Sequence, residues 1–160
     1  MLLPVLLIAA CLMMWGCSKG KINPMSSSEQ EQLISALRDA YRAFNRGDLD
    51  AAVQLLSPDV EWSEPPEFPG GGSYHGRDRA KQYLTQSRAA WSEVESQPED
   101  FVVVGNRIVV FVRARLKAKS TDAWREVKLA DVYTFQNGQA VNMQAFADRK
   151  QALKWVGVEK

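Results

Sequence analysis

The chain has 160 residues, of which 46% are apolar and 24% are charged. This is the size of one domain and the composition of a globular protein, which excludes a disordered, repetitive or collagen-like chain. Twenty lysines and arginines against nineteen aspartates and glutamates leave a net charge of +1, so we expect no nucleic-acid partner. One histidine and two cysteines argue against a multi-histidine metal site and a disulfide framework, and we expect neither metal nor cofactor.

The start of the chain differs from the rest. Residues 1–17 read MLLPVLLIAACLMMWGC, which is uncharged and almost entirely apolar. The run is short for a membrane span and has the length of the apolar part of a secretory signal. Cys17 resembles the lipidated cysteine of a bacterial lipoprotein, which predicts a secreted protein or one anchored to a membrane only through its lipid. The alternative is translation from Met25 and a cytoplasmic protein.

The first half of the remaining chain has helical patterning. Residues 18–25 are expected to form a polar linker and residues 26–160 a single domain. Ser28 and Glu31 have the spacing of a capping box, and apolar residues at helical spacing predict a helix from there to about Arg46. The elements expected next are a short helix capped by Asp48, a strand over 60–63, a loop over 64–73 rich in proline and glycine, and a helix over 77–91.

In the second half the apolar period changes to two, which is the period of a strand. The turn signals Gly105-Asn106 and Asn137-Gly138 mark two hairpins. Helices followed by antiparallel strands predict an α+β domain, in which a curved sheet with helices on one side encloses a pocket. The elements expected here are strands over 93–104, 107–119, 124–136 and 139–147, and a last helix capped by Asp148 that ends at Trp155.

The strand over 124–136 carries an acidic residue on an apolar face. Alternation places Asp131 on one face with Leu129, Tyr133 and Phe135. If this face lines the pocket, desolvation favours the protonated form of Asp131, which is then a hydrogen-bond donor or a general acid. The alternative is a structural aspartate that pairs with Arg113 or with a backbone amide.

Five segments, in this order along the chain, resemble the SnoaL-like proteins of the nuclear transport factor 2-like superfamily, which also includes ketosteroid isomerase and polyketide cyclases. They are residues 41–52, 56–62, 74–78, 132–138 and 147–149. The resemblance implies a cone-shaped α+β barrel, cystatin-like, whose bent sheet wraps a long helix around an open apolar cavity. It further implies a small, largely apolar ligand and a homodimer. Because the superfamily contains isomerases, cyclases, hydrolases and non-catalytic binders, the activity stays open.

The comparison with ketosteroid isomerase assigns roles to individual residues. Glu64 stands where that enzyme has its general base, directly after the first strand and before a proline, and Asp131 stands where it has a neutral, donating aspartic acid. Ala40 matches its oxyanion-hole tyrosine, and Tyr41 is expected on another face of the helix, which argues against steroid isomerisation. The resemblance therefore implies that Glu64 removes a proton beside a carbonyl group that Asp131 polarises. The alternative for Glu64 is a solvated loop residue.

The remaining candidates surround the expected cavity. His75 is expected at its mouth, where it shuttles protons or, alternatively, only holds the loop in place. The residues expected to contact a ligand are Tyr41, Trp62, Phe68, Tyr133 and Phe146. Phe68 lies in a glycine-rich loop that suits a lid. Two hypotheses compete: an acid–base isomerase, cyclase or hydrolase, and a non-catalytic ligand-binding or dimeric accessory domain.

Overall fold

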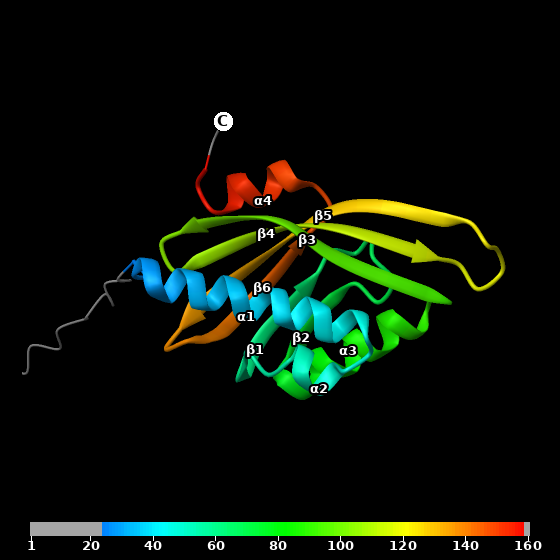
Figure 1. Ribbon diagram of the computed structural model, residues 1–160, viewed down its shortest axis with the longest axis horizontal. Helices are drawn as coiled ribbons and strands as arrows, with labels where there is room; N and C mark the ends of the chain where they lie inside the picture. Colours follow the sequence, from blue (N-terminus) through cyan, green and yellow to red (C-terminus); the bar gives the residue numbers. More distant parts are fainter. Residues whose placement is uncertain (1–23, 159–160) are drawn as a thin grey trace, which may run out of the picture.

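A curved sheet wraps around the long first helix in the computed structural model, which describes residues 24–158 (Figure 1). Cys17 and the predicted leader lie outside the described residues. No helix within the described range is long and apolar enough to cross a membrane. The elements are α1 (Ser27–Asn45), α2 (Leu49–Ala52), β1 (Leu56–Glu64), β2 (Gly72–His75), α3 (Arg77–Ala89), β3 (Glu93–Val104), β4 (Arg107–Lys117), β5 (Trp124–Gln136), β6 (Gln139–Phe146) and α4 (Arg149–Trp155).

The described strands form one six-stranded sheet in the order β2-β1-β6-β5-β4-β3. The strands from β3 to β6 are an antiparallel meander, as expected, whereas β1 pairs parallel to β6. Asn137 and Gly138 both have positive φ, 50° and 76°, which is the backbone that a two-residue hairpin turn requires. The parallel pairing places β1 next to β6, and β6 in turn pairs with β5. One strand therefore separates β1 from β5.

The main core lies between α1 and the concave face of the sheet. Leu33 and Leu37 of α1 are buried with Ile108 and Val110 of β4 and Met143 of β6 in one apolar cluster. Their spacing by four residues on the helix and by two on the strand is the reason why one face of each element is buried. The α+β architecture predicted from the sequence is confirmed.

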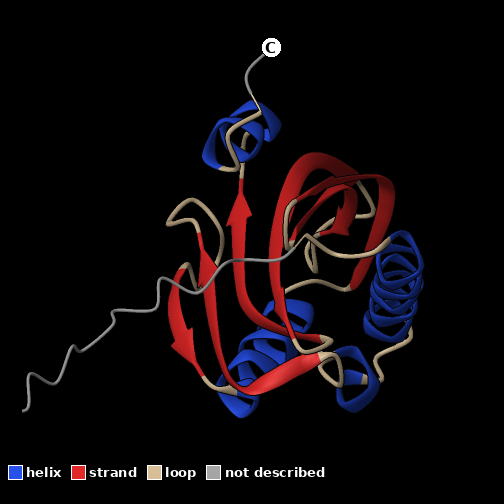
Figure 2. Ribbon diagram, turned by 90° about the vertical axis from the view of Figure 1, so that its left-hand side faces the viewer, coloured by secondary structure: helices blue, strands red, loops and turns tan. Residues whose placement is uncertain are grey.

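The last helix packs on the opposite side of the sheet, so the expectation that all helices cover one face is wrong (Figure 2). Ala152 and Val156 of α4 form a second, smaller core with Val109 and Val132. These two strand residues alternate with those that face α1. Both faces of β4 and β5 are therefore buried near α4, which explains their nearly continuous apolar sequence.

Three boundaries differ from the sequence prediction. Helix α1 begins two residues earlier, because the side chain of Ser26, not Ser28, accepts a hydrogen bond from the backbone N–H of Glu29. Strand β1 extends through Pro58, which lies where the β1–β6 register shifts and where its missing N–H removes no regular ladder bond. Strand β2 lies partly in the expected loop, since a four-residue edge strand has too little alternation to be recognised.

Candidate functional site

The concave side of the sheet holds a cavity of about 460 Å³. Its wall is mostly apolar and comes from α1, α2, α3, β1, β4, β5 and the loop after β1. This volume lies within the usual range for small-molecule sites. The polar and ionisable residues of the wall are Tyr41, Glu64, Glu67, Tyr83, Ser87, Arg125, Asp131 and Tyr133.

Asp131 lies on the inner face of β5, in the cavity wall, as the alternation predicted. The hydroxyl of Tyr41 on α1 donates a hydrogen bond to Oδ2 of Asp131. Tyr41 follows Leu33 and Leu37 at intervals of four residues, so it lies on the buried face of the helix, and the expectation that it lies on another face is wrong. The alternative pairing with Arg113 is also wrong, because Arg113 contacts Gln97 and Glu99 instead.

Glu64 is the last residue of β1 and also lines the cavity. The indole Nε1 of Trp62 donates a hydrogen bond of 2.8 Å to its Oε1. Residues 62 and 64 point to the same side of the strand, because side chains alternate with a period of two. Glu64 is therefore a half-buried wall residue, and the alternative of a solvated loop glutamate is wrong.

The two carboxyls have different proton affinities. Burial raises the pKa of Asp131 to about 6, although the hydrogen bond from Tyr41 lowers it in part. Burial and the nearby charge of Asp131 raise the pKa of Glu64 to about 8, against smaller opposite effects of Trp62 and Tyr83. These surroundings thus favour ionisation of Asp131 before Glu64. This is the reverse of the order that the sequence comparison implied.

Aromatic rings surround the pair. The ring of Trp62 lies 6.5 Å from that of Tyr83 and 6.4 Å from that of Tyr133, the latter edge-on. Burial raises the pKa of both tyrosines above the ordinary value, so their hydroxyls stay protonated. The carboxyls therefore lie in an apolar, aromatic surrounding with a few neutral donors, which favours binding of a largely apolar molecule.

A family model described as SnoaL-like domain matches residues 37–143, which include α3, β3, β4 and β5 in full. The chain belongs to the SnoaL-like domain family. Many solved structures share its fold. A search of curated proteins gave no match for this SnoaL-like domain.

Three solved structures illustrate the likeness of this SnoaL-like domain to its relatives. An NTF2-like protein of unknown function from Burkholderia pseudomallei is 28% identical, with a TM-score of 0.66 over 83% of this chain and 99% of that one. TerC, co-crystallised with polyporic acid, is 22% identical, with a TM-score of 0.65 over 78% and 97%. A protein from Jannaschia sp. CCS1 described as a SnoaL-like polyketide cyclase is 15% identical, with a TM-score of 0.64 over 85% and 97%.

Two predicted site residues of the SnoaL-like domain lie away from the cavity. Phe146 packs against Trp155 of α4, with ring centroids 5.9 Å apart, on the opposite side of the sheet. His75 is exposed on the edge strand β2, where its Nδ1 pairs with Glu61. The expectations that Phe146 contacts a ligand and that His75 stands at the mouth are therefore wrong. Trp62, Phe68 and Tyr133, by contrast, line the cavity of the domain as predicted.

Several wall residues of the SnoaL-like domain were absent from the sequence prediction. Tyr83 and Trp91 line the cavity but were not among the residues expected to contact a ligand. Arg125 lines it too, and the same alternation that identified Asp131 could have found it six residues earlier on β5. Glu67, in the loop after β1, also lies in the wall.

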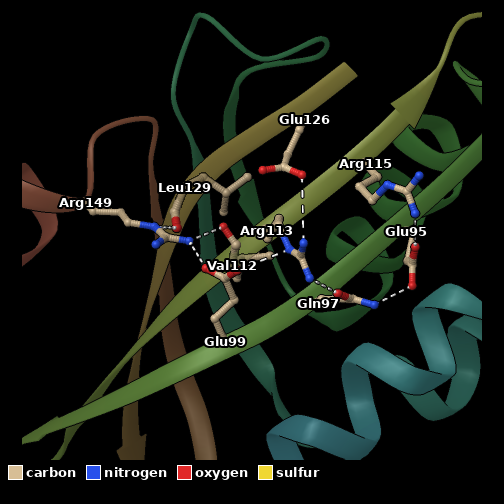
Figure 3. A network of polar contacts seen from close by, with 9 residues as sticks. All are labelled: Glu95, Gln97, Glu99, Val112, Arg113, Arg115, Glu126, Leu129 and Arg149. Carbon is tan, nitrogen blue, oxygen red and sulfur yellow. Dashed lines mark hydrogen bonds and ion pairs between the residues drawn. The ribbon is translucent and has the colours of Figure 1, made fainter. Parts of the chain in front are cut away.

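Arg113 and Arg115 of β4 alternate with the cavity residues Ala114 and Leu116, so they face the other way, onto the solvated side of the sheet. Figure 3 shows how glutamates of the neighbouring strand β3 neutralise them. Arg113 pairs with Glu99 at 3.2 Å, and Arg115 pairs with Glu95 at 3.5 Å. In this SnoaL-like domain Arg113 and Arg115 therefore belong to a surface network of ion pairs, and their charges are separate from the cavity.

Proposed function

We propose that this SnoaL-like domain binds a small, largely apolar carbonyl compound and transfers a proton at the carbon beside the carbonyl group. Asp131 is the base and Glu64 is the acid. The observation that carries the proposal is the presence of two carboxyls with separated proton affinities in one apolar cavity, which is the arrangement that acid–base catalysis requires.

The proposed reaction uses each carboxyl in the state that its surroundings favour. The ionised Asp131 takes the proton from the C–H bond, and that bond's electron pair forms the new double bond of an enol. The protonated Glu64 donates to the carbonyl oxygen, where the charge develops. In a carbonyl compound with a β,γ double bond, the proton on Asp131 goes to the γ carbon and the enol O–H returns its proton to Glu64, which moves the double bond and completes an isomerisation. In a molecule with a second carbonyl group, the enol carbon attacks the carbon of that group, whose C=O π bond breaks. The resulting alkoxide takes the proton from Asp131, and the enol O–H returns its proton to Glu64, which completes a cyclisation.

The order of the roles rests on the difference in proton affinity, because each carboxyl accepts a hydrogen bond, Asp131 from Tyr41 and Glu64 from Trp62. Asp131 accepts the hydrogen bond of Tyr41 through Oδ2, a contact that supports the ionised form. Its charge in turn opposes ionisation of Glu64. Ionisation of one carboxyl therefore keeps the other protonated, and the pair is in the working state near neutral pH.

The relatives agree with a small-molecule cavity. TerC was co-crystallised with polyporic acid, and a ketosteroid isomerase-like fold from Catenulispora acidiphila holds trimethylamine. SalBIII, a further structural relative, is an epoxide hydrolase/cyclase-like enzyme with a role in pyran ring formation. These likenesses support a small-molecule ligand and leave its identity to experiment.

Proton exchange at carbon tests the proposal directly. We expect the protein to accelerate the exchange of the α-hydrogens of 2-tetralone, an aromatic ketone, for deuterium in heavy water, followed by NMR. Asp131→Asn should lower the rate by about 10²- to 10⁴-fold, the usual contribution of a positioned base. Glu64→Gln should lower it less, because an amide still donates a hydrogen bond. His75→Gln is the control and should leave the rate unchanged, since His75 lies outside the cavity.

A non-catalytic binding domain is the second candidate, and one observation favours it. Each carboxyl is already engaged by a neighbouring side chain, Asp131 by Tyr41 and Glu64 by Trp62. Such contacts also occur in purely structural networks. If 2-tetralone causes chemical-shift changes at the cavity residues without any accelerated exchange, the binding function stands and the catalytic one is refuted.

A further inference from the structure

The cavity wall carries a cation at a distance from the two carboxyls. Arg125, Val127, Leu129 and Asp131 follow one another at intervals of two on β5, and all four line the cavity. Exposure falls in the same direction, because Arg125 is exposed, Leu129 is half-buried and Tyr133 is buried. Arg125 therefore marks the mouth of the cavity, and the half-buried Asp131 lies further in.

Arg125 differs in its partners from Arg113 and Arg115 of the same hairpin. Arg113 and Arg115 on the outer face of β4 are paired with glutamates (Figure 3). Over the described range 24–158, Arg125 has no carboxylate within ion-pair distance, and Glu67, the acidic residue of the rim, is not paired with it. Its charge is thus available to a ligand that enters the cavity.

The distance between Arg125 and Asp131 limits the length of a ligand that contacts both residues. Six residues of strand at about 3.3 Å each set an upper limit of about 20 Å on the distance between the α-carbons of Arg125 and Asp131, because the sheet is curved. The wall between them is apolar and includes Val127 and Leu129, with Leu116 from β4 and Trp91 after α3. The complementary molecule is elongated, with an apolar middle and different groups at its ends.

We infer that the ligand is an elongated amphiphilic carboxylate, whose carboxylate binds Arg125 at the mouth and whose uncharged, polar end reaches Asp131. The inference rests on the proposed function, since it names the class of molecule that the cavity takes. A guanidinium is the side chain best suited to a carboxylate, which it binds through two parallel hydrogen bonds. The negative Asp131 repels an anionic end, so the two charges fix the direction in which the molecule enters.

Matched probes with one apolar body test the inference. Binding of decanoate, decanol and decylamine is followed through the fluorescence of the cavity tryptophans, Trp62 and Trp91. We expect Arg125→Gln to weaken decanoate binding about five- to tenfold and to leave decanol binding unchanged, because only the anion loses a charge-assisted hydrogen bond. Arg115→Gln, on the outer face of the same hairpin, is the matched control and should change neither.

The outcomes separate the inference from the proposed function. Added salt should weaken decanoate binding to the wild type and not to Arg125→Gln. If Arg125→Gln affects decanoate and decanol equally, or affects neither, Arg125 is a solvated rim residue and the inference is overturned while the cavity still binds apolar molecules. Equal losses in Arg125→Gln and Arg115→Gln, or tighter binding of decylamine than of decanoate, would overturn it as well. If no probe binds the wild type, the proposed function itself fails, and the inference fails with it.

Discussion

The hydroxyl of Tyr41 on α1 donates a hydrogen bond to Oδ2 of Asp131 on β5 and so joins the long helix to the strand that forms part of the cavity wall. The contact engages Oδ2 and leaves Oδ1 outside this hydrogen bond. It also partly offsets the cost of burying a negative charge. The proposed base is therefore positioned by the element around which the sheet is wrapped.

Removal of that hydrogen bond should raise the pKa of Asp131. Because the Tyr41 hydroxyl lowers the pKa of Asp131, Tyr41→Phe is expected to raise this pKa above its value of about 6, by roughly one unit. The titration is followed by carbon NMR of the Asp131 carboxyl. Tyr74→Phe is the control, because the Tyr74 hydroxyl bonds to the backbone of Gly70 instead. An unchanged or lower pKa in Tyr41→Phe would show that the contact does not stabilise the carboxylate.

The proton affinity of Glu64 should depend on Trp62 in the same sense. The indole N–H donates to Glu64 and lowers its pKa, so Trp62→Phe is expected to raise the pKa of Glu64 above about 8. The size should again be about one unit, the usual effect of one hydrogen bond to a charged group. Carbon NMR of the Glu64 carboxyl measures it, with Trp91→Phe as the control. A fall in the pKa after Trp62→Phe would contradict the assignment.

Both carboxyls should make the fold less stable as the pH rises. Their pKa values in the folded protein, about 6 and about 8, lie above the ordinary values of 3.8 and 4.5. The folded state therefore binds more protons than the unfolded one between about pH 4 and pH 8, and stability falls across that window. We expect a loss of about 3 kcal/mol or more between about pH 5 and pH 9, measured by urea unfolding.

The double variant Asp131→Asn with Glu64→Gln provides the comparison for this pH effect. It should lose most of the slope, because neither replacement titrates. A wild type that becomes more stable with rising pH relative to the variant would contradict the raised pKa values.

The apolar patterns predicted most of the fold. Strands β3 and β5 have the predicted ends, because alternation and the Gly105 and Asn137 turn signals act locally. The parallel pairing of β1 with β6 joins segments far apart in sequence, and no local pattern encodes it. The short edge strand β2 was missed for a related reason, since its partner β1 stabilises it more than its own residues do.

The site was predictable where a residue follows the period of its element. Asp131 was found in this way, and Arg125 and Tyr41 follow the same kind of period on β5 and α1. Phe146 was misplaced because alternation gives two faces and the sequence does not show which one α4 covers. The proton affinities could not be predicted, because they depend on contacts between α1, β1 and β5 that only the folded structure brings together.

The opposite positions of Phe146 and Phe68 give a final prediction that separates packing from binding. Phe146 packs under α4, so Phe146→Ala should lower the free energy of unfolding by about 2 to 3 kcal/mol and leave decanol affinity unchanged. Phe68 lies in the loop after β1 and lines the cavity, so Phe68→Ala should reduce decanol affinity severalfold with a smaller effect on stability. Urea unfolding and fluorescence titration of both variants measure the two quantities. Loss of decanol binding in a folded Phe146→Ala protein would mean that the ligand site extends to the other side of the sheet.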